Sequence, residues 1–262
     1  MIGLVYSVKD VTAREAAQHL INEYGFALKG EVLTEGDVSL HEVDDSLNAD
    51  SVDSLGLDVA CFLSKHESVA KIASLTVHAE GNWNDRADAG GRPGKLSVAA
   101  PVEMRSVLSS FYSHEIADIK KTYEATHHGP LLNTPSFFAE IGGGRVSRGE
   151  AQAYAEAVYE AIIDAKDGKI SYEKIAIGIG GGHYPMPFTK LAVDKGYAFA
   201  HIMPTYAFLN ADGTDNFGMV EEAVRKSGVE PDVAVLDKRI DTGSRTTIIE
   251  KLKESGIECE EV

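Results

Sequence analysis

The chain alternates between short continuous apolar runs, which are typical of buried strands, and apolar residues at helical spacing. The clearest helix follows Ser147, because Ser147 and Glu150 form a capping box ahead of apolar positions that recur every three or four residues. Further helices are predicted over residues 13–24, 104–116, 188–194, 217–226 and 244–254. Strands are predicted at the start of the chain and over residues 57–64, 72–78, 122–129, 136–142, 174–179, 197–201, 233–236 and 257–259.

The order of these elements predicts an α/β fold, a three-layer sandwich of helices around a mixed, mostly parallel sheet. Helices separate most of the strands, as parallel neighbours require. Within residues 57–78 and within residues 122–141, two strands follow each other without a helix, which favours antiparallel pairing inside each pair. No stretch has the composition of an interdomain linker, so one domain over residues 1–262 is expected.

The formal net charge of −16 argues against a protein that holds nucleic acid through its overall electrostatic field. Much of the excess lies between Glu35 and Asp58, a stretch without Lys or Arg that we interpret as a solvated acidic flap. A nucleic-acid substrate would therefore need a local basic surface. The candidates for that surface are Lys120, Lys121, Arg145, Arg148, Lys190, Lys195, Lys238, Arg239 and Arg245.

The remaining composition fits a cytoplasmic protein without a membrane partner. The two cysteines, Cys61 and Cys259, are compatible with reduced thiols, although one bridge between them would also satisfy the count. No apolar run reaches the length of a membrane span, and charge occurs too early in the first ten residues for a secretory signal.

Histidines stand at the ends of several predicted strands. His183 follows a strand and three glycines, His201 closes the next strand, and His78 closes an earlier one. Ligands of open α/β sheets bind beyond the carboxyl ends of the strands, so these side chains are candidates for one shared cavity. They could bind zinc, or act without metal as general bases and oxyanion donors, although a lone strand histidine is more often a core residue. The other strand-terminal candidates are His127, His128 and Glu140.

The glycines before His183 invite comparison with nucleotide-binding loops. Gly178 and Gly180 match the start of a dinucleotide fingerprint, but His183 replaces its third glycine and His201 stands where its acidic residue is expected. No P-loop lysine follows either. An NAD or ATP site is therefore disfavoured, which leaves a cradle for a phosphate or carbonyl oxygen, or simply a tight turn.

Two other kinds of hydrolase site are disfavoured. His41, His66 and His114 each precede a glutamate, but none has the second histidine of the H-E-x-x-H motif, and we interpret all three as solvated surface. A G-x-S-x-G elbow is also missing from the sequence. Apolar residues near the histidine loops are expected in the core, with a base-stacking or side-chain pocket as the alternative. These residues are Met186, Phe188, Met203, Tyr206 and Phe208.

Five segments together resemble the archaeal and plant type of D-aminoacyl-tRNA deacylase. They are TVHAEGN (76–82), THHGP (126–130), PSFFAEIG (135–142), GGGHYPMPFTK (180–190) and HIMPTYAF (201–208), and the amino-terminal third matches less distinctly. The resemblance implies hydrolysis of the ester between a D-amino acid and the terminal ribose of tRNA. It also implies a core related to peptidyl-tRNA hydrolase and phosphorylase-like folds, and a dependence on Zn²⁺.

The chemistry of the matching residue types suggests a hypothesis for their roles. His183, or zinc held by it, would activate water, while the amides of Gly181 and Gly182 would stabilise the oxyanion. His128 or Glu140 would orient the base or complete the metal shell. The candidate metal ligands are His78, His127, His128 and His183, and the candidate substrate-binding residues are His78, Asn82, Thr189, Lys190 and His201.

Lys190 is expected to meet a phosphate of the tRNA acceptor end, and binding is expected to concentrate on the CCA terminus. A monomer or a small homo-oligomer is expected. Two alternatives stay open at this level: a zinc-dependent peptidase or phosphorylase-like hydrolase of small molecules, and a non-catalytic tRNA-binding protein whose histidines only hold structure.

Overall fold

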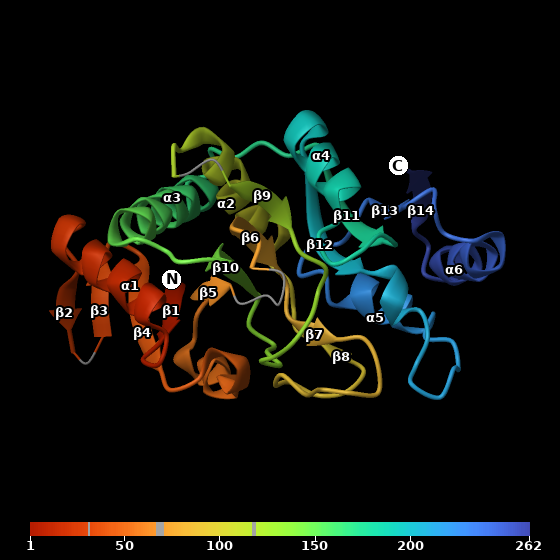
Figure 1. Cartoon of the computed structure of the whole chain (residues 1–262), viewed down its shortest axis with the longest axis horizontal. Helices are drawn as coiled ribbons and strands as arrows, with labels where there is room; N and C mark the ends of the chain where they lie inside the picture. The colour runs from red at the N-terminus through yellow and green to blue at the C-terminus, as the bar shows by residue number, and fades with distance from the viewer. Residues whose placement is uncertain (31, 67–70, 117–118) are drawn as a thin grey trace.

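The computed structural model describes residues 1–30, 32–66, 71–116 and 119–262 (Figure 1). Its helices are α1 (Val11–Glu23), α2 (Pro101–Ser113), α3 (Arg148–Lys166), α4 (Met186–Lys195), α5 (Met219–Arg225) and α6 (Thr242–Glu254). Its strands are β1 (Ile2–Ser7), β2 (Ala27–Lys29), β3 (Val32–Glu35), β4 (Val38–Val43), β5 (Val59–His66), β6 (Ser74–His78), β7 (Gly81–Asn82), β8 (Lys95–Leu96), β9 (Lys120–Tyr123), β10 (Ser136–Gly142), β11 (Lys174–Ile179), β12 (Tyr197–Met203), β13 (Val233–Leu236) and β14 (Glu258–Glu261). Short 3-10 helices are η1 (Ser46–Asn48), η2 (Asp50–Leu55) and η3 (Thr205–Ala207).

The strands form a large mixed sheet and a smaller parallel one. The large sheet has the order β2-β3-β4-β1-β5-β10-β6-β9, and the smaller has the order β12-β11-β13-β14. The α/β class with a mixed sheet is therefore confirmed. The strands after residue 170 form a sheet of their own, on the side of the molecule that carries α6 in Figure 1.

The predicted pairing of consecutive strands is wrong, although the mixed character of the sheet is right. Strand β10 lies between β5 and β6, parallel to β5 and antiparallel to β6, and β9 pairs with β6 rather than with β10. All seven residues of β10 are buried, as expected of a central strand rich in phenylalanine. The antiparallel register sets Phe138 opposite His78, which places the end of β6 beside an interior residue of β10.

The acidic stretch between Glu35 and Asp58 is not a solvated flap. It contains β4, which pairs in parallel with β1 and buries Val38 and Leu40. Its acids have structural partners too, since Asp53 accepts hydrogen bonds from the amides of residues 133 and 134. The sequence analysis missed β4 because its apolar run is short and charged residues flank it.

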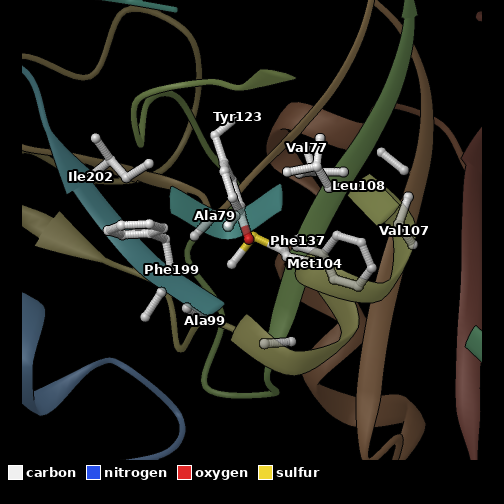
Figure 2. Close-up of a cluster of buried hydrophobic side chains, with 14 of the residues drawn as sticks. Val77, Ala79, Ala99, Met104, Val107, Leu108, Tyr123, Phe137, Phe199 and Ile202 are labelled. Carbon is white, nitrogen blue, oxygen red and sulfur yellow. The ribbon is translucent and has the colours of Figure 1, made fainter. Parts of the chain in front are cut away.

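One continuous apolar core connects the two sheets. Helices α1, α2 and α3 pack against strands of the large sheet, and α2 also contacts β12 of the smaller sheet. Figure 2 shows Tyr123 of β9 beside Phe199 of β12, with ring centroids 5.8 Å apart, close to Met104 of α2. The core thereby fixes the strand ends of both sheets relative to one another. Among the described residues, no helix combines the length and apolar character needed to cross a membrane.

Candidate active site

A cavity of about 910 Å³ opens where β5 and β10 end, beside the amino terminus of α1. Its lining includes His66, His127, His128, Glu140 and His183. These residues come from widely separated parts of the chain, as expected for a ligand site at the carboxyl edge of an α/β sheet.

Three imidazoles meet at one side of this cavity and form the three-histidine cluster, His78, His127 and His128. Their ring centroids lie 4.2 to 4.8 Å apart. Each Nδ1 lies within hydrogen-bond distance of a nearby backbone carbonyl, at 3.1, 2.8 and 2.7 Å respectively. Because a carbonyl only accepts, Nδ1 carries the proton in all three rings, and each Nε2 keeps a free lone pair.

The three-histidine cluster fits a zinc ion. One nitrogen of each ring lies within 4.8 Å of the others, and the buried Nε2 of His78 has no hydrogen-bond partner among the described residues. Burial and the neighbouring imidazoles lower the pKa of His127 well below its usual range, and burial with His78 lowers the pKa of His128 to about 4. Neutral imidazoles whose Nδ1–H donates to a carbonyl are the usual protein ligands of zinc.

A buried carboxylate, Glu124, lies between the cluster and two further histidines. Its Oε2 is 2.8 Å from Nε2 of His183 and 3.6 Å from Nε2 of His127, and its Oε1 is 3.1 Å from Nδ1 of His66. A second carboxylate, Glu140, lies 2.9 Å from the same Nδ1 of His66. The site therefore combines two interior carboxylates with imidazoles at ion-pair distance.

The electrostatics of Glu140 reflect this arrangement. Burial raises the pKa of its carboxyl, but the hydrogen bond from His66 and the nearby imidazoles His78 and His128 outweigh burial and lower it overall. Glu140 is consequently a carboxylate at neutral pH. Its charge lies 3.9 Å from Nε2 of His78, next to the place where the fitted metal ion would bind.

Comparison with known proteins shows which family this sequence matches. The family model described as D-aminoacyl-tRNA deacylase matches residues 54–260. The chain belongs to the D-aminoacyl-tRNA deacylase family. The D-aminoacyl-tRNA deacylase of Staphylothermus marinus is 32% identical over 95% of this chain and 94% of its own length, and that of Desulfurococcus amylolyticus is 34% identical over 91% of each. The resemblance seen in the sequence is thus confirmed.

A solved structure shows the same fold. The crystal structure described as a conserved protein of unknown function matches 100% of this chain and 95% of its own, with a TM-score of 0.85 and 24% identity. The two-sheet architecture of this deacylase-family member is therefore that of an existing crystal structure.

His201 is a family signature position that the structure does not bring to the cavity. It is fully buried, and its Nε2 lies 3.1 and 3.2 Å from the carbonyls of Ser97 and Lys226. Its Nδ1 is 3.2 Å from the hydroxyl of Thr126, and burial lowers its pKa to about 4. The predicted strand end at His201 is wrong because β12 continues to Met203, so that His201 lies inside the strand and away from the cavity.

Three further residues that were predicted to bind substrate lie outside the large cavity. Thr189 is buried in α4 and bonds the hydroxyl of Thr122 at 2.8 Å, which packs α4 against β9. Lys190 is exposed on α4 and lines neither this cavity nor the smaller one described below. Asn82 donates to the carbonyl of Gly90 at 2.9 Å and borders the smaller cavity.

The triple-glycine bend delivers His183 but does not face the cavity. Gly180 and Gly181 adopt φ angles of +103° and +77°, and a Cβ on Gly180 would lie 2.8 Å from Cβ of Asp237. Gly181 and Gly182 line neither cavity, so the predicted oxyanion donors are not placed there. These glycines therefore match the other prediction made for them, a tight turn.

Two site residues were missed by the sequence analysis. His66 was interpreted as solvated surface, yet it is 4% exposed at the end of β5 and its Nε2 lies 2.8 Å from the hydroxyl of Tyr184. Glu67, which follows it, lies outside the described residues. Glu124 precedes His127 by three positions, and an acid inside a predicted strand that leads to a histidine pair was the available signal.

Proposed function

We propose that this protein hydrolyses the ester bond of D-aminoacyl-tRNA and releases the free D-amino acid and the tRNA. Membership of the D-aminoacyl-tRNA deacylase family supports the reaction. The observation that carries the proposal is the buried Glu124, which lies between His66 and His183 and borders the three-histidine cluster. An aminoacyl ester is an activated acyl group, so an oriented base and a polarising cation suffice for its hydrolysis.

The three-histidine cluster would hold Zn²⁺. When bound, zinc polarises a carbonyl oxygen and lowers the pKa of the water that it binds. The charges of the surroundings favour such a cation, because Glu124 and Glu140 are buried while His127 and His128 are neutral. Two interior carboxylates beside neutral imidazoles are stabilised by a divalent ion.

His183 would act as the general base. Its Nε2 lies 2.8 Å from Oε2 of Glu124, so the carboxylate would favour the tautomer that carries the proton on Nε2 and leaves Nδ1 able to take a proton from water. The side chain of His183 is 34% exposed and lines the large cavity. Glu124 would position the base by fixing its tautomer, the role that the sequence analysis assigned to His128 or Glu140.

Glu140 would position His66. Its carboxylate accepts from Nδ1 of His66, whose Nε2 in turn accepts from the hydroxyl of Tyr184. This chain of hydrogen bonds holds the cavity wall beside the three-histidine cluster. A tRNA substrate would also account for a cytoplasmic location.

Release of tyrosine from D-tyrosyl- and L-tyrosyl-tRNA, before and after chelation, tests the proposal. We expect release of the D-amino acid to exceed that of the L-amino acid, to stop on chelation and to resume when zinc is added. No release of D-tyrosine by the zinc-loaded protein would refute it. Equal turnover of a free D-tyrosine ester or a peptide, unaffected by tRNA, would instead support a small-molecule hydrolase.

A further inference from the structure

The three-histidine cluster separates two cavities of different size. The large cavity, of about 910 Å³, is the one described above. The small cavity, of about 310 Å³, is lined by Trp83, Tyr206 and Leu209 among others. Both cavities are lined by His127 and His128, so a group held at these histidines has access to both.

The large cavity is ionic. Lys9, Lys65 and Arg145 line it from three separate segments of a chain whose net charge is −16. Two carboxylates of the same wall accept from backbone amides, Asp10 from residues 13 and 65 and Asp45 from residue 47, while Lys9 pairs with Asp44. Cations on three segments of one wall suit an anionic, extended ligand such as a phosphodiester chain.

The small cavity is lined by rings, aliphatic carbons and amides, together with the charged side chains of Asp85 and Arg86, of which Arg86 pairs with Asp88. Tyr206 and Leu209 are 60% and 55% exposed. The amide of Asn84 donates to the carbonyl of Leu209 at 2.7 Å, and that of Asn82 donates to Gly90, so these amides hold the wall in place. Trp83 is buried and donates to the carbonyl of Thr126. Tyr206 and Leu209 are the exposed ring and aliphatic side chain of this wall, which a ligand's side chain would contact.

The substrate has two unequal arms that meet at the scissile carbonyl. One is a single amino-acid side chain of variable polarity, and the other is a ribose followed by nucleotides that carry a phosphate each. Resting on the proposed function, we propose that the small cavity holds the aminoacyl side chain and the large cavity holds the 3′ nucleotides. The hydroxyl of Tyr206 lies 3.5 Å from Nδ1 of His183, so the side-chain pocket begins beside the proposed base.

Tyr206 and Leu209 therefore determine which side chains are accepted. A wall that combines a phenol ring with an aliphatic side chain and opens to solvent discriminates weakly among side chains, as apolar pockets do for differences of a few methylene groups. Filling this pocket should exclude large side chains before small ones.

The test compares Leu209→Trp with the control variant Val11→Trp. Val11 lines the large cavity and is 57% exposed at the first residue of α1, so both substitutions add the same ring at an exposed aliphatic position. The measured quantity is the ratio of kcat/KM for D-tyrosyl-tRNA to that for D-alanyl-tRNA. We expect this ratio to fall at least tenfold in Leu209→Trp and to stay within twofold of wild type in Val11→Trp.

A ratio that changes in Val11→Trp, or that stays constant in both variants, would overturn the assignment of the cavities. The wild-type protein separates this result from failure of the proposed function. If zinc-loaded wild type releases neither D-tyrosine nor D-alanine, the proposed function fails; if it releases both, the ratios judge the pocket alone.

Discussion

His78 and His201 are both fully buried, yet their ring nitrogens have opposite surroundings. Carbonyl and hydroxyl groups occupy both nitrogens of His201, whereas Nε2 of His78 has no hydrogen-bond partner among the described residues. Leaving such an atom unsatisfied costs about 1–3 kcal/mol, so it is retained where a ligand compensates for it. A buried histidine with satisfied nitrogens stabilises the fold, and one with a free nitrogen marks a site.

Substitution of His78 by phenylalanine tests the functional half of this comparison. Its ring stacks on Phe138 with centroids 5.3 Å apart, and phenylalanine can keep that contact without an unsatisfied nitrogen. We expect deacylation to be abolished and zinc content to fall, while the unfolding free energy of the metal-free variant stays within about 1 kcal/mol of metal-free wild type. Turnover, metal analysis and urea denaturation measure the three effects. Full zinc occupancy in the variant would contradict the comparison.

Glu124 contacts the proposed base His183, whereas Glu140 contacts His66 in the cavity wall, so substitutions at the two glutamates should differ in effect. In Glu124→Gln the amide cannot hold the proton on Nε2 of His183, so we expect kcat to fall by a factor on the order of 10²–10⁴. Glu140 contacts His66 rather than the base, so in the matched variant Glu140→Gln we expect kcat to fall only about tenfold. Single-turnover release of D-tyrosine measures both, and a larger loss in Glu140→Gln would reverse the assignment.

The pH dependence of stability tests the structural half. The pKa of His201 is about 4 in the folded protein, so the unfolded chain, with a pKa near 6.5, binds more protons between these values. His201 therefore lowers the unfolding free energy by about 3 kcal/mol as pH falls from 6.5 to 4, and has no such effect above 6.5. Subtracting the profile of His201→Phe removes the other titrating groups. A constant difference between the two profiles would contradict the burial of a neutral ring.

At pH 7 the same variant should show the smallest effect. His201→Phe removes the donor to the carbonyl of Ser97, while the carbonyl of Lys226 still accepts from the amide of Ala99, so we expect a loss of about 2 kcal/mol in unfolding free energy. Because His201 lines neither cavity, kcat for D-tyrosyl-tRNA should stay within about twofold of wild type. A large loss of kcat with unchanged stability would place His201 in the site after all.

The sequence predicted a residue at the sheet edge correctly only where it also located the end of the strand that carries the residue. Apolar runs followed by glycine or proline correctly placed His78 at the end of β6 and His183 after β11, whereas β9 ends at Tyr123 and the predicted strand end at His127 and His128 was wrong. The same rule failed for His201 because two more apolar residues follow it in β12. His66 also stands at the end of a strand, but it was missed because the predicted strand ended two residues too early.

The residues that complete the site depend on tertiary contacts. Glu124 approaches His183 because the loop between β11 and α4 lies against the segment after β9, where the amide of Ala125 donates to the carbonyl of His183, and such a contact is not encoded in the local pattern. Similarly, the insertion of β10 between β5 and β6, which brings Glu140 to His66, reverses the pairing that adjacency in sequence favours. Helix boundaries were recovered closely because caps are local, as with Asp10 and Ser147.

The location of bound metal tests the central claim most directly. Crystals of the protein loaded with zinc would be measured above and below the zinc absorption edge. We predict an anomalous peak about 2.0–2.1 Å from Nε2 of His78, His127 and His128. An active, zinc-dependent enzyme whose only peak lies away from these three rings would contradict the account.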